Sequence, residues 1–153
     1  MSRRVIFLDI DGVLAPIRRW DRYGDLDPAC VRVLNEIVAG AGAHVVVSST
    51  WRHGKTVAEL QAMLEAGGFT GRVLDKTPAG APGADRGDEI GAWLAVNAVG
   101  GYVIIDDHVD VGALRARLVL THPGHGLRPA DAPRAIEILM RPPALDGRLA
   151  VDL

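Results

Sequence analysis

Short, uninterrupted apolar runs alternate with longer segments of helical periodicity along this chain. The runs are rich in β-branched residues and too short for most helices, as expected for strands buried on both faces. Most are followed by a segment whose apolar residues recur every three or four positions, the pattern of an amphipathic helix. Strands are predicted at 5–10, 43–49, 72–74, 101–107 and 116–121, and helices at 28–39, 56–66, 88–97 and 130–140. This alternation predicts an α/β fold with a parallel sheet, right-handed crossovers and helices on both faces.

The ends of the predicted helices carry ordinary capping signals. Asp27 is a suitable N-cap, Pro28 fits the first helical turn, and Gly40 and Gly42 end that helix. Neither an internal repeat nor a domain-sized linker is visible, so residues 1–153 are predicted to form one domain. The segment 77–88 is the most loop-like, and 142–153 is predicted to be a loosely attached tail.

Composition argues against several functional classes, although it does not exclude a local basic patch that binds nucleic acid. Apolar residues make up 48% of the chain and charged residues 24%, as in an ordinary globular domain. The formal net charge of −2 gives no bulk attraction to nucleic acid or to an anionic membrane. The single cysteine, Cys30, lies in a helical pattern and is predicted to pack in the core. No apolar run is long enough for a leader or a membrane span, so we expect a cytoplasmic protein without membrane contact. The composition leaves open whether the protein forms a homo-oligomer.

Acidic and hydroxyl side chains follow three of the predicted strands. Asp9 and Asp11 end the first, residues 48–50 (Ser-Ser-Thr) end the second, and Asp106 and Asp107 end the fourth. Ligands of parallel α/β sheets bind at this carboxyl edge. Aspartates that follow buried strands are costly to desolvate unless they are paired or bind a metal. Their convergence predicts a hard divalent cation with oxygen ligands, most naturally Mg²⁺.

The segment 45–56, VVVSSTWRHGKT, allows a second interpretation. "GKT" after a strand is also found in the P-loop of nucleotide hydrolases, and "YVIID" resembles their Mg²⁺-positioning strand. However, the P-loop pattern needs a glycine five residues before Gly54, where this chain has Ser49. It also leaves Asp9 and Asp11 without a role. A P-loop-like nucleotide hydrolase is therefore the alternative, along with a non-catalytic phosphate-binding module.

The acidic motifs resemble a known family. "VIFLDIDGVL" is similar to the opening motif of the haloacid dehalogenase superfamily, and "VVVSST", "RGDEIGAWL" and "YVIIDD" follow in that family's order over about residues 4–122. The closest resemblance is to the phosphatase-type domain of multi-domain RNA-repair proteins. It implies a three-layer α/β/α Rossmannoid domain without a large cap, acting as a Mg²⁺-dependent phosphomonoesterase.

The resemblance also implies roles for the acidic residues. Asp9 would be the nucleophile that forms an aspartyl-phosphate, and Asp11 would be the general acid and base. Mg²⁺ would be held by Asp9, by the main-chain carbonyl of Asp11 and by Asp107. Asp107 is preferred to Asp106 because it lies further out of the strand, while Asp106 would orient the cation next to it. Asp110 is a candidate for holding a metal-bound water.

The phosphoryl-binding hydroxyl is assigned to Ser48, with Ser49 as the rival. Its neighbour Thr50, and Gly12 beside the first acidic pair, are further candidates for substrate contact. The cation that neutralises the negative charge of the phosphoryl group is assigned to Arg86 or, alternatively, to Lys76. Arg52 is predicted to reach the substrate as well.

The intervals between these motifs are largely filled by predicted helices and strands, which leaves no room for a sizeable cap. An open site of this kind would admit a phosphorylated small molecule or the phosphorylated end of a nucleic acid. The stretch at about 13–26 is predicted to be a flap beside the site. Its cations and aromatic rings suit a nucleotide: Arg18, Arg19, Trp20, Arg22 and Tyr23.

Overall fold

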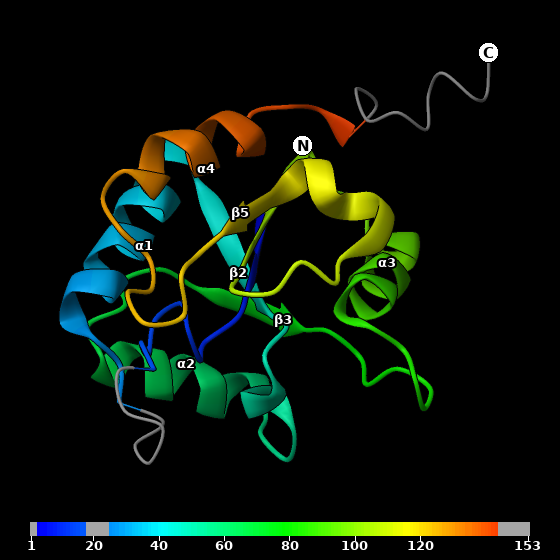
Figure 1. Ribbon diagram of the computed structural model, residues 1–153, viewed down its shortest axis with the longest axis horizontal. Coiled ribbons are helices and arrows are strands. Elements are labelled where there is room, and N and C mark those ends of the chain that lie inside the picture. The colour runs from blue at the N-terminus through cyan, green and yellow to red at the C-terminus, as the bar shows by residue number, and fades with distance from the viewer. Residues whose placement is uncertain (1–2, 18–24, 144–153) are drawn as a thin grey trace.

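The computed structural model describes residues 3–17 and 25–143 and has five strands in one parallel sheet. The strands are β1 (Arg4–Leu8), β2 (Ala43–Val47), β3 (Val73–Lys76), β4 (Gly101–Asp106) and β5 (Leu118–Leu120). Their order across the sheet is β3-β2-β1-β4-β5. The helices are α1 (Pro28–Ala41), α2 (Val57–Ala66), α3 (Arg86–Val96) and α4 (Asp131–Leu139). The predicted α/β architecture is confirmed, without an inserted cap domain in the described chain (Figure 1).

Helices cover both faces of the sheet. The larger apolar cluster joins α1, α2 and α4 to one face, and a smaller cluster joins α3 to the other (Figure 1). Side chains of β1 alternate between the two, with Ile6 and Leu8 in the first cluster and Val5 and Phe7 in the second. This alternation decides on which face each functional side chain after β1 lies.

The capping signals of the sequence act as predicted in α1, except that Gly40 lies within the helix instead of ending it. Asp27 accepts a hydrogen bond from the backbone N–H of Ala29, and Gly42 ends the helix in the left-handed conformation at φ 63°. In α2, Thr56 forms a capping box with Glu59, so the "GKT" segment ends at a helix N-cap.

Helix α3 begins two residues earlier than predicted. Asp85 is its N-cap and forms a capping box with Asp88, which places Arg86 in the first turn instead of in the preceding loop. Two short 3-10 helices, η1 (Thr50–Arg52) and η2 (Gly112–Arg117), were not predicted, because three-residue spacing over so few positions leaves no clear pattern.

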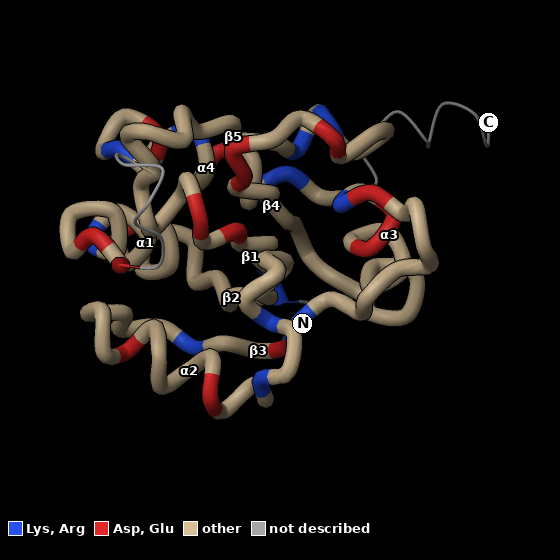
Figure 2. The backbone as a smooth tube through the Cα atoms, turned by 60° about the horizontal axis from the view of Figure 1, so that its bottom comes forward, with Lys and Arg blue, Asp and Glu red and all other residues tan. Residues whose placement is uncertain are grey.

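Acidic and basic positions are interspersed around the described backbone (Figure 2). The predicted flap is only partly visible, since its candidates Arg18, Arg19, Trp20, Arg22 and Tyr23 lie outside the described residues, as does the tail from 144 onward. The segments on either side of this gap pack on the core: Ile17 N–H donates to the carbonyl of Pro123, and Asp27 N–H to that of Leu14.

Candidate active site

The carboxyl ends of three adjacent strands carry polar side chains in register. Leu8 of β1 lies opposite Val47 of β2 and Ile105 of β4. Two backbone hydrogen bonds, each 3.0 Å long, continue this ladder by one residue. Ser48 N–H donates to the carbonyl of Leu8, and Asp9 N–H donates to that of Ile105. The polar residues that follow the strands are therefore neighbours: Asp9, Ser48 and Asp106. By the side-chain alternation of β1, they lie on the α3 face of the sheet.

Three acidic side chains gather at this edge. Carboxylate oxygens of Asp9, Asp106 and Asp107 lie within 4.8 Å of one another. Asp9 is only 5% exposed and Asp106 is fully buried. Burial raises the pKa of Asp9, although the positive charge of Arg86 opposes this effect. Burial and the charge of Asp9 raise the pKa of Asp106 to about 8. The cluster is therefore short of positive charge.

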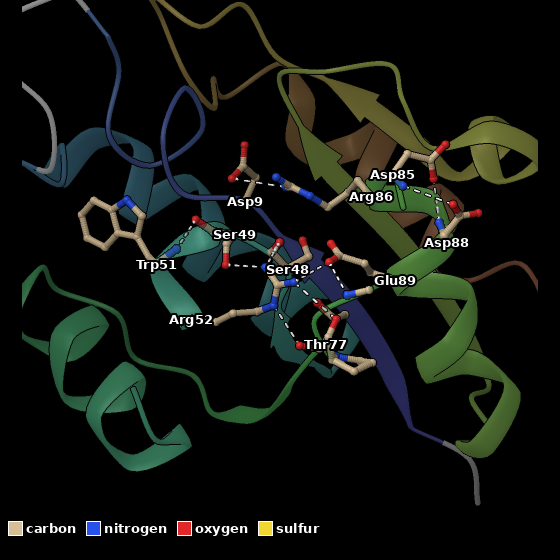
Figure 3. A network of polar contacts seen from close by, with 12 residues as sticks. Asp9, Ser48, Ser49, Trp51, Arg52, Thr77, Asp85, Arg86, Asp88 and Glu89 are labelled. Carbon is tan, nitrogen blue, oxygen red and sulfur yellow. Dashed lines mark hydrogen bonds and ion pairs between the residues drawn. The ribbon is translucent and has the colours of Figure 1, made fainter. Parts of the chain in front are cut away.

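Arg86 supplies part of that charge from the first turn of α3. Its Nη1 lies 2.7 Å from Oδ2 of Asp106. The same atom lies 3.4 Å from Oδ1 of Asp9, and Figure 3 shows this contact. The carboxylates raise the pKa of Arg86 against the opposing effect of burial, so the guanidinium stays charged. The structure thus brings the predicted cation to the predicted nucleophile.

The donor atoms at the site fit a hard divalent cation. One oxygen of Asp107, Oδ1, is buried and has no hydrogen-bond partner among the described residues. It lies 3.6 Å from Nε2 of the exposed His108, beyond hydrogen-bond range. One arginine cannot neutralise three clustered carboxylates, and a metal ion with oxygen ligands would do so. Asp9, Asp106 and Asp107 can therefore hold a metal.

Gly12 makes room for Asp107. A Cβ atom built on Gly12 would lie 2.2 Å from Oδ2 of Asp107, and its φ of 79° is a conformation that side chains rarely adopt. The hydroxyl of Thr121 donates to the Gly12 carbonyl at 2.7 Å and fixes this loop against the end of β5. Gly12 was predicted to contact substrate. In the structure its missing side chain allows the loop after β1 to lie against Asp107 at the end of β4.

Asp11 has a partner that the sequence did not reveal. Its Oδ2 accepts a hydrogen bond of 3.0 Å from the indole Nε1 of Trp51, and its Oδ1 is buried and unpartnered among the described residues. The Asp11 side chain is not in the three-acid cluster, which agrees with a metal contact through its main-chain carbonyl. No spacing rule links positions 11 and 51, so only the fold could show this pair.

The two serines after β2 have different surroundings. The hydroxyl of Ser48 is fully buried and has no described partner, whereas that of Ser49 accepts the backbone N–H of Trp51 and caps η1. A buried hydroxyl without a partner is costly and suits a ligand oxygen. These contacts favour Ser48 over Ser49 as the phosphoryl-binding hydroxyl. Thr50 is exposed at the start of η1.

The prediction that Arg52 reaches the substrate is wrong. Arg52 is 2% exposed. The five N–H donors of its guanidinium are all used within the protein (Figure 3). They donate to the carbonyls of Ser48, Ser49, Thr77 and Pro78 and to the carboxylate of Glu89. Arg52 instead ties the ends of β2 and β3 to α3.

Lysines of the "GKT" and β3 segments are likewise engaged with the backbone. Nζ of Lys76 donates to the carbonyl of Lys55 at 2.6 Å, and Nζ of Lys55 donates to that of Trp51 at 3.2 Å. These contacts favour Arg86 over Lys76 as the phosphate-neutralising cation. They also contradict the P-loop alternative, because η1 and the Thr56 cap occupy the segment that would wrap a nucleotide phosphate.

A parallel sheet with acids and a hydroxyl at its carboxyl edge, in this strand order, defines a HAD-like protein. Residues 5–132 match the family model of the HAD domain in Swiss Army Knife RNA repair proteins, and the chain belongs to that family. No curated protein matches the sequence closely. Among the described helices, none combines the length and hydropathy needed to span a bilayer.

The raised pKa of Asp106 predicts a pH-dependent stability. Its carboxyl ordinarily titrates near 3.8 and titrates at about 8 in the fold. Between these values the folded state binds a proton that the unfolded chain has lost, so the metal-free protein should become less stable as pH rises. Thermal unfolding in EDTA should show a melting temperature that falls from about pH 5 to pH 8.

The same experiment with a divalent cation should show the opposite trend, because metal binding requires deprotonated carboxylates. In Asp106→Asn the titrating group is absent, and the fall in EDTA should become shallower. A melting temperature that is equally insensitive to pH in both proteins would contradict the assignment.

Proposed function

We propose that the protein is a Mg²⁺-dependent phosphomonoesterase that acts through an aspartyl-phosphate on Asp9. The observation that carries the proposal is the buried cluster of Asp9, Asp106 and Asp107, with Arg86 beside the proposed nucleophile. Family membership supports the same chemistry. Asp9, Asp107 and the main-chain carbonyl of Asp11 would hold the Mg²⁺. When bound, the cation would screen the phosphate from the carboxylates and withdraw charge from its oxygens.

Each residue has a defined part in the reaction. A carboxylate oxygen of Asp9 forms the bond to phosphorus while the bond to the leaving oxygen breaks. Asp11 gives its proton to that oxygen, and then accepts a proton from the water that hydrolyses the aspartyl-phosphate and releases inorganic phosphate. The hydroxyl of Ser48, which has no partner in the described parts of the chain, donates to one phosphoryl oxygen, and Arg86 neutralises another.

The phosphorylated end of a nucleic acid is the substrate class that we propose. The family is described from RNA repair proteins. The described chain has no cap domain over the carboxyl edge, so a phosphate on a long polymer can approach. A small phosphometabolite would leave most of such an open site without contacts.

The test is release of inorganic phosphate by the purified protein. An aryl phosphate, a panel of phosphometabolites, and oligonucleotides phosphorylated at either the 3′ or the 5′ end would be supplied with Mg²⁺ and, separately, with EDTA. We expect turnover only with Mg²⁺, and a kcat/KM for one class of oligonucleotide at least about tenfold above that of the metabolites, because polymer contacts add binding energy.

Two results would count against this proposal in different ways. Efficient turnover of one metabolite in preference to oligonucleotides would refute the substrate class and keep the reaction. Binding of Mg²⁺ and phosphate without any turnover would favour the non-catalytic phosphate-binding module.

A further inference from the structure

The turn after β2 presents one side chain to each of two different parts of the fold. Arg52 extends to β3 and α3, as described above, while the indole of Trp51 extends the other way (Figure 3). Trp51 is partly buried against the larger apolar cluster, and its Nε1 donates to Asp11 Oδ2 at 3.0 Å. The contact joins two loops that are forty residues apart.

The backbone of Trp51 is held on both sides. Its N–H donates to the hydroxyl of Ser49 at 3.2 Å, and its carbonyl accepts from Nζ of Lys55 at 3.2 Å. The next residue, Arg52, uses its five donors within the protein. Because this turn is fixed, the indole has little freedom to move away from Asp11. It can therefore hold the carboxyl group of Asp11 in one orientation.

An indole N–H can donate a hydrogen bond but cannot accept one. Oδ2 of Asp11 must therefore be the accepting oxygen of this contact. The other oxygen, Oδ1, is buried and has no partner among the described residues, which leaves it as the atom that can carry and transfer a proton. The contact thus distinguishes the two oxygens of a group that would otherwise rotate between equivalent positions.

We propose that Trp51 is a positioning residue, which orients the carboxyl group of Asp11 so that Oδ1 delivers the proton to the leaving oxygen. This inference rests on the proposed function and goes beyond it by assigning a role to Trp51. The proton moves from Oδ1 to the departing alkoxide as the bond from phosphorus to that oxygen breaks. Trp51 keeps its own proton throughout.

Two substrates with different leaving groups distinguish a positioning role of Trp51 from general structural damage by the substitution. An alkyl phosphate needs a proton on its poor leaving group, whereas p-nitrophenyl phosphate releases a stable phenolate without one. In Trp51→Phe, kcat/KM for the alkyl phosphate should fall about tenfold or more, and that for p-nitrophenyl phosphate by less than about threefold. The ratio kcat/KM is the appropriate measure because it covers departure of the leaving group and excludes later hydrolysis of the aspartyl-phosphate.

Trp93 provides a matched control. Its indole Nε1 also donates to an aspartate, Asp75 Oδ2, at 2.8 Å, and its ring is buried. Trp93→Phe therefore removes the same kind of hydrogen bond on the α3 side of the molecule, near Arg3 and Val5 at the start of β1. We expect it to change kcat/KM for the two substrates by similar factors.

A second measurement does not depend on activity. The chain has three tryptophans, so its ¹H–¹⁵N spectrum should contain three indole signals. The signal that Trp51→Phe removes should move upfield in Asp11→Ala, while the signal removed by Trp93→Phe should stay in place. If Trp51→Phe fails to fold, the Trp51 signal can be assigned by elimination from Trp20→Phe and Trp93→Phe, because the chain has three tryptophans. A Trp51 signal that does not move in Asp11→Ala would overturn the proposal.

The kinetic outcomes are equally decisive. Equal losses for both substrates in Trp51→Phe, with an active wild type, would overturn the positioning role and leave the proposed function intact. A wild-type protein that releases phosphate from neither of these esters nor from any phosphorylated oligonucleotide would refute the proposed function and the role of Trp51 together.

Discussion

Asp9→Asn should abolish phosphate release, with a loss of at least about 10³-fold in kcat, because the amide cannot form the aspartyl-phosphate. The change keeps the size of the side chain and removes one negative charge from a buried cluster whose carboxylates are costly to ionise. We therefore expect the metal-free variant to fold and to be at least as stable as the wild type. Phosphate release and thermal unfolding in EDTA measure the two effects separately.

Asp75→Asn is the matched control for this experiment. Asp75 is partly buried and hydrogen-bonded to Trp93 near the start of β1, at the opposite end of that strand from Asp9, and no described contact links it to the acidic cluster. Its replacement should leave phosphate release within about twofold of the wild type, as for a residue outside the reacting atoms. Retention of most of the activity in Asp9→Asn would disprove the nucleophile and with it the proposed reaction.

Arg52→Met should cause the largest loss of stability. The substitution removes the guanidinium donors of four backbone carbonyls and of the Glu89 carboxylate. The carbonyl of Ser49 keeps the backbone N–H of residue 52, and Glu89 keeps that of Gly80, so the cost falls mainly on the other three carbonyls and on the lost ion pair. Breaking a buried, charged pair of this kind costs about 3–5 kcal/mol. That loss corresponds to a melting temperature lowered by roughly 6–20 °C for a domain of this size. Calorimetry or circular dichroism would measure it.

Two further variants test whether the loss arises from the guanidinium. Arg128 is exposed, and Arg128→Met should change stability by less than about 0.5 kcal/mol. Adding Glu89→Gln to Arg52→Met removes the carboxylate charge that has lost its partner, so the double variant should recover part of the loss. If Arg52→Met is as stable as Arg128→Met, the buried contacts of Arg52 contribute nothing measurable.

The sequence was sufficient for the sheet and for most of the acidic cluster. Residues such as Asp9 and Asp106 end buried strands, and parallel strands bring their carboxyl ends to one edge, so their meeting follows from local pattern alone. Arg86 was predicted from the family motif, and the capping box of Asp85 and Asp88 explains how the start of α3 carries it to the site.

Contacts between side chains of distant loops could not be predicted in the same way. Trp51 and Asp11 meet because the turn after β2 and the loop after β1 follow neighbouring strands. The sequence does not reveal this contact, because a 3-10 turn of three residues has no periodic pattern. Arg52 was misassigned for a related reason: an arginine beside a predicted site suggests a ligand contact, and only the structure shows the acceptors that use all its donors.

The in-register placement of Asp9, Ser48 and Asp106 has a consequence for how such a domain can diversify. A slip of one residue in β1, β2 or β4 would turn the reacting group of that strand to the opposite side of the sheet. The pairing of the strands therefore fixes the distances between the side chains of Asp9, Ser48 and Asp106. An insertion within one of these strands would disrupt that arrangement. New substrates must be accommodated by lengthening or recomposing the connections beyond the strands, where extra residues leave that spacing unchanged.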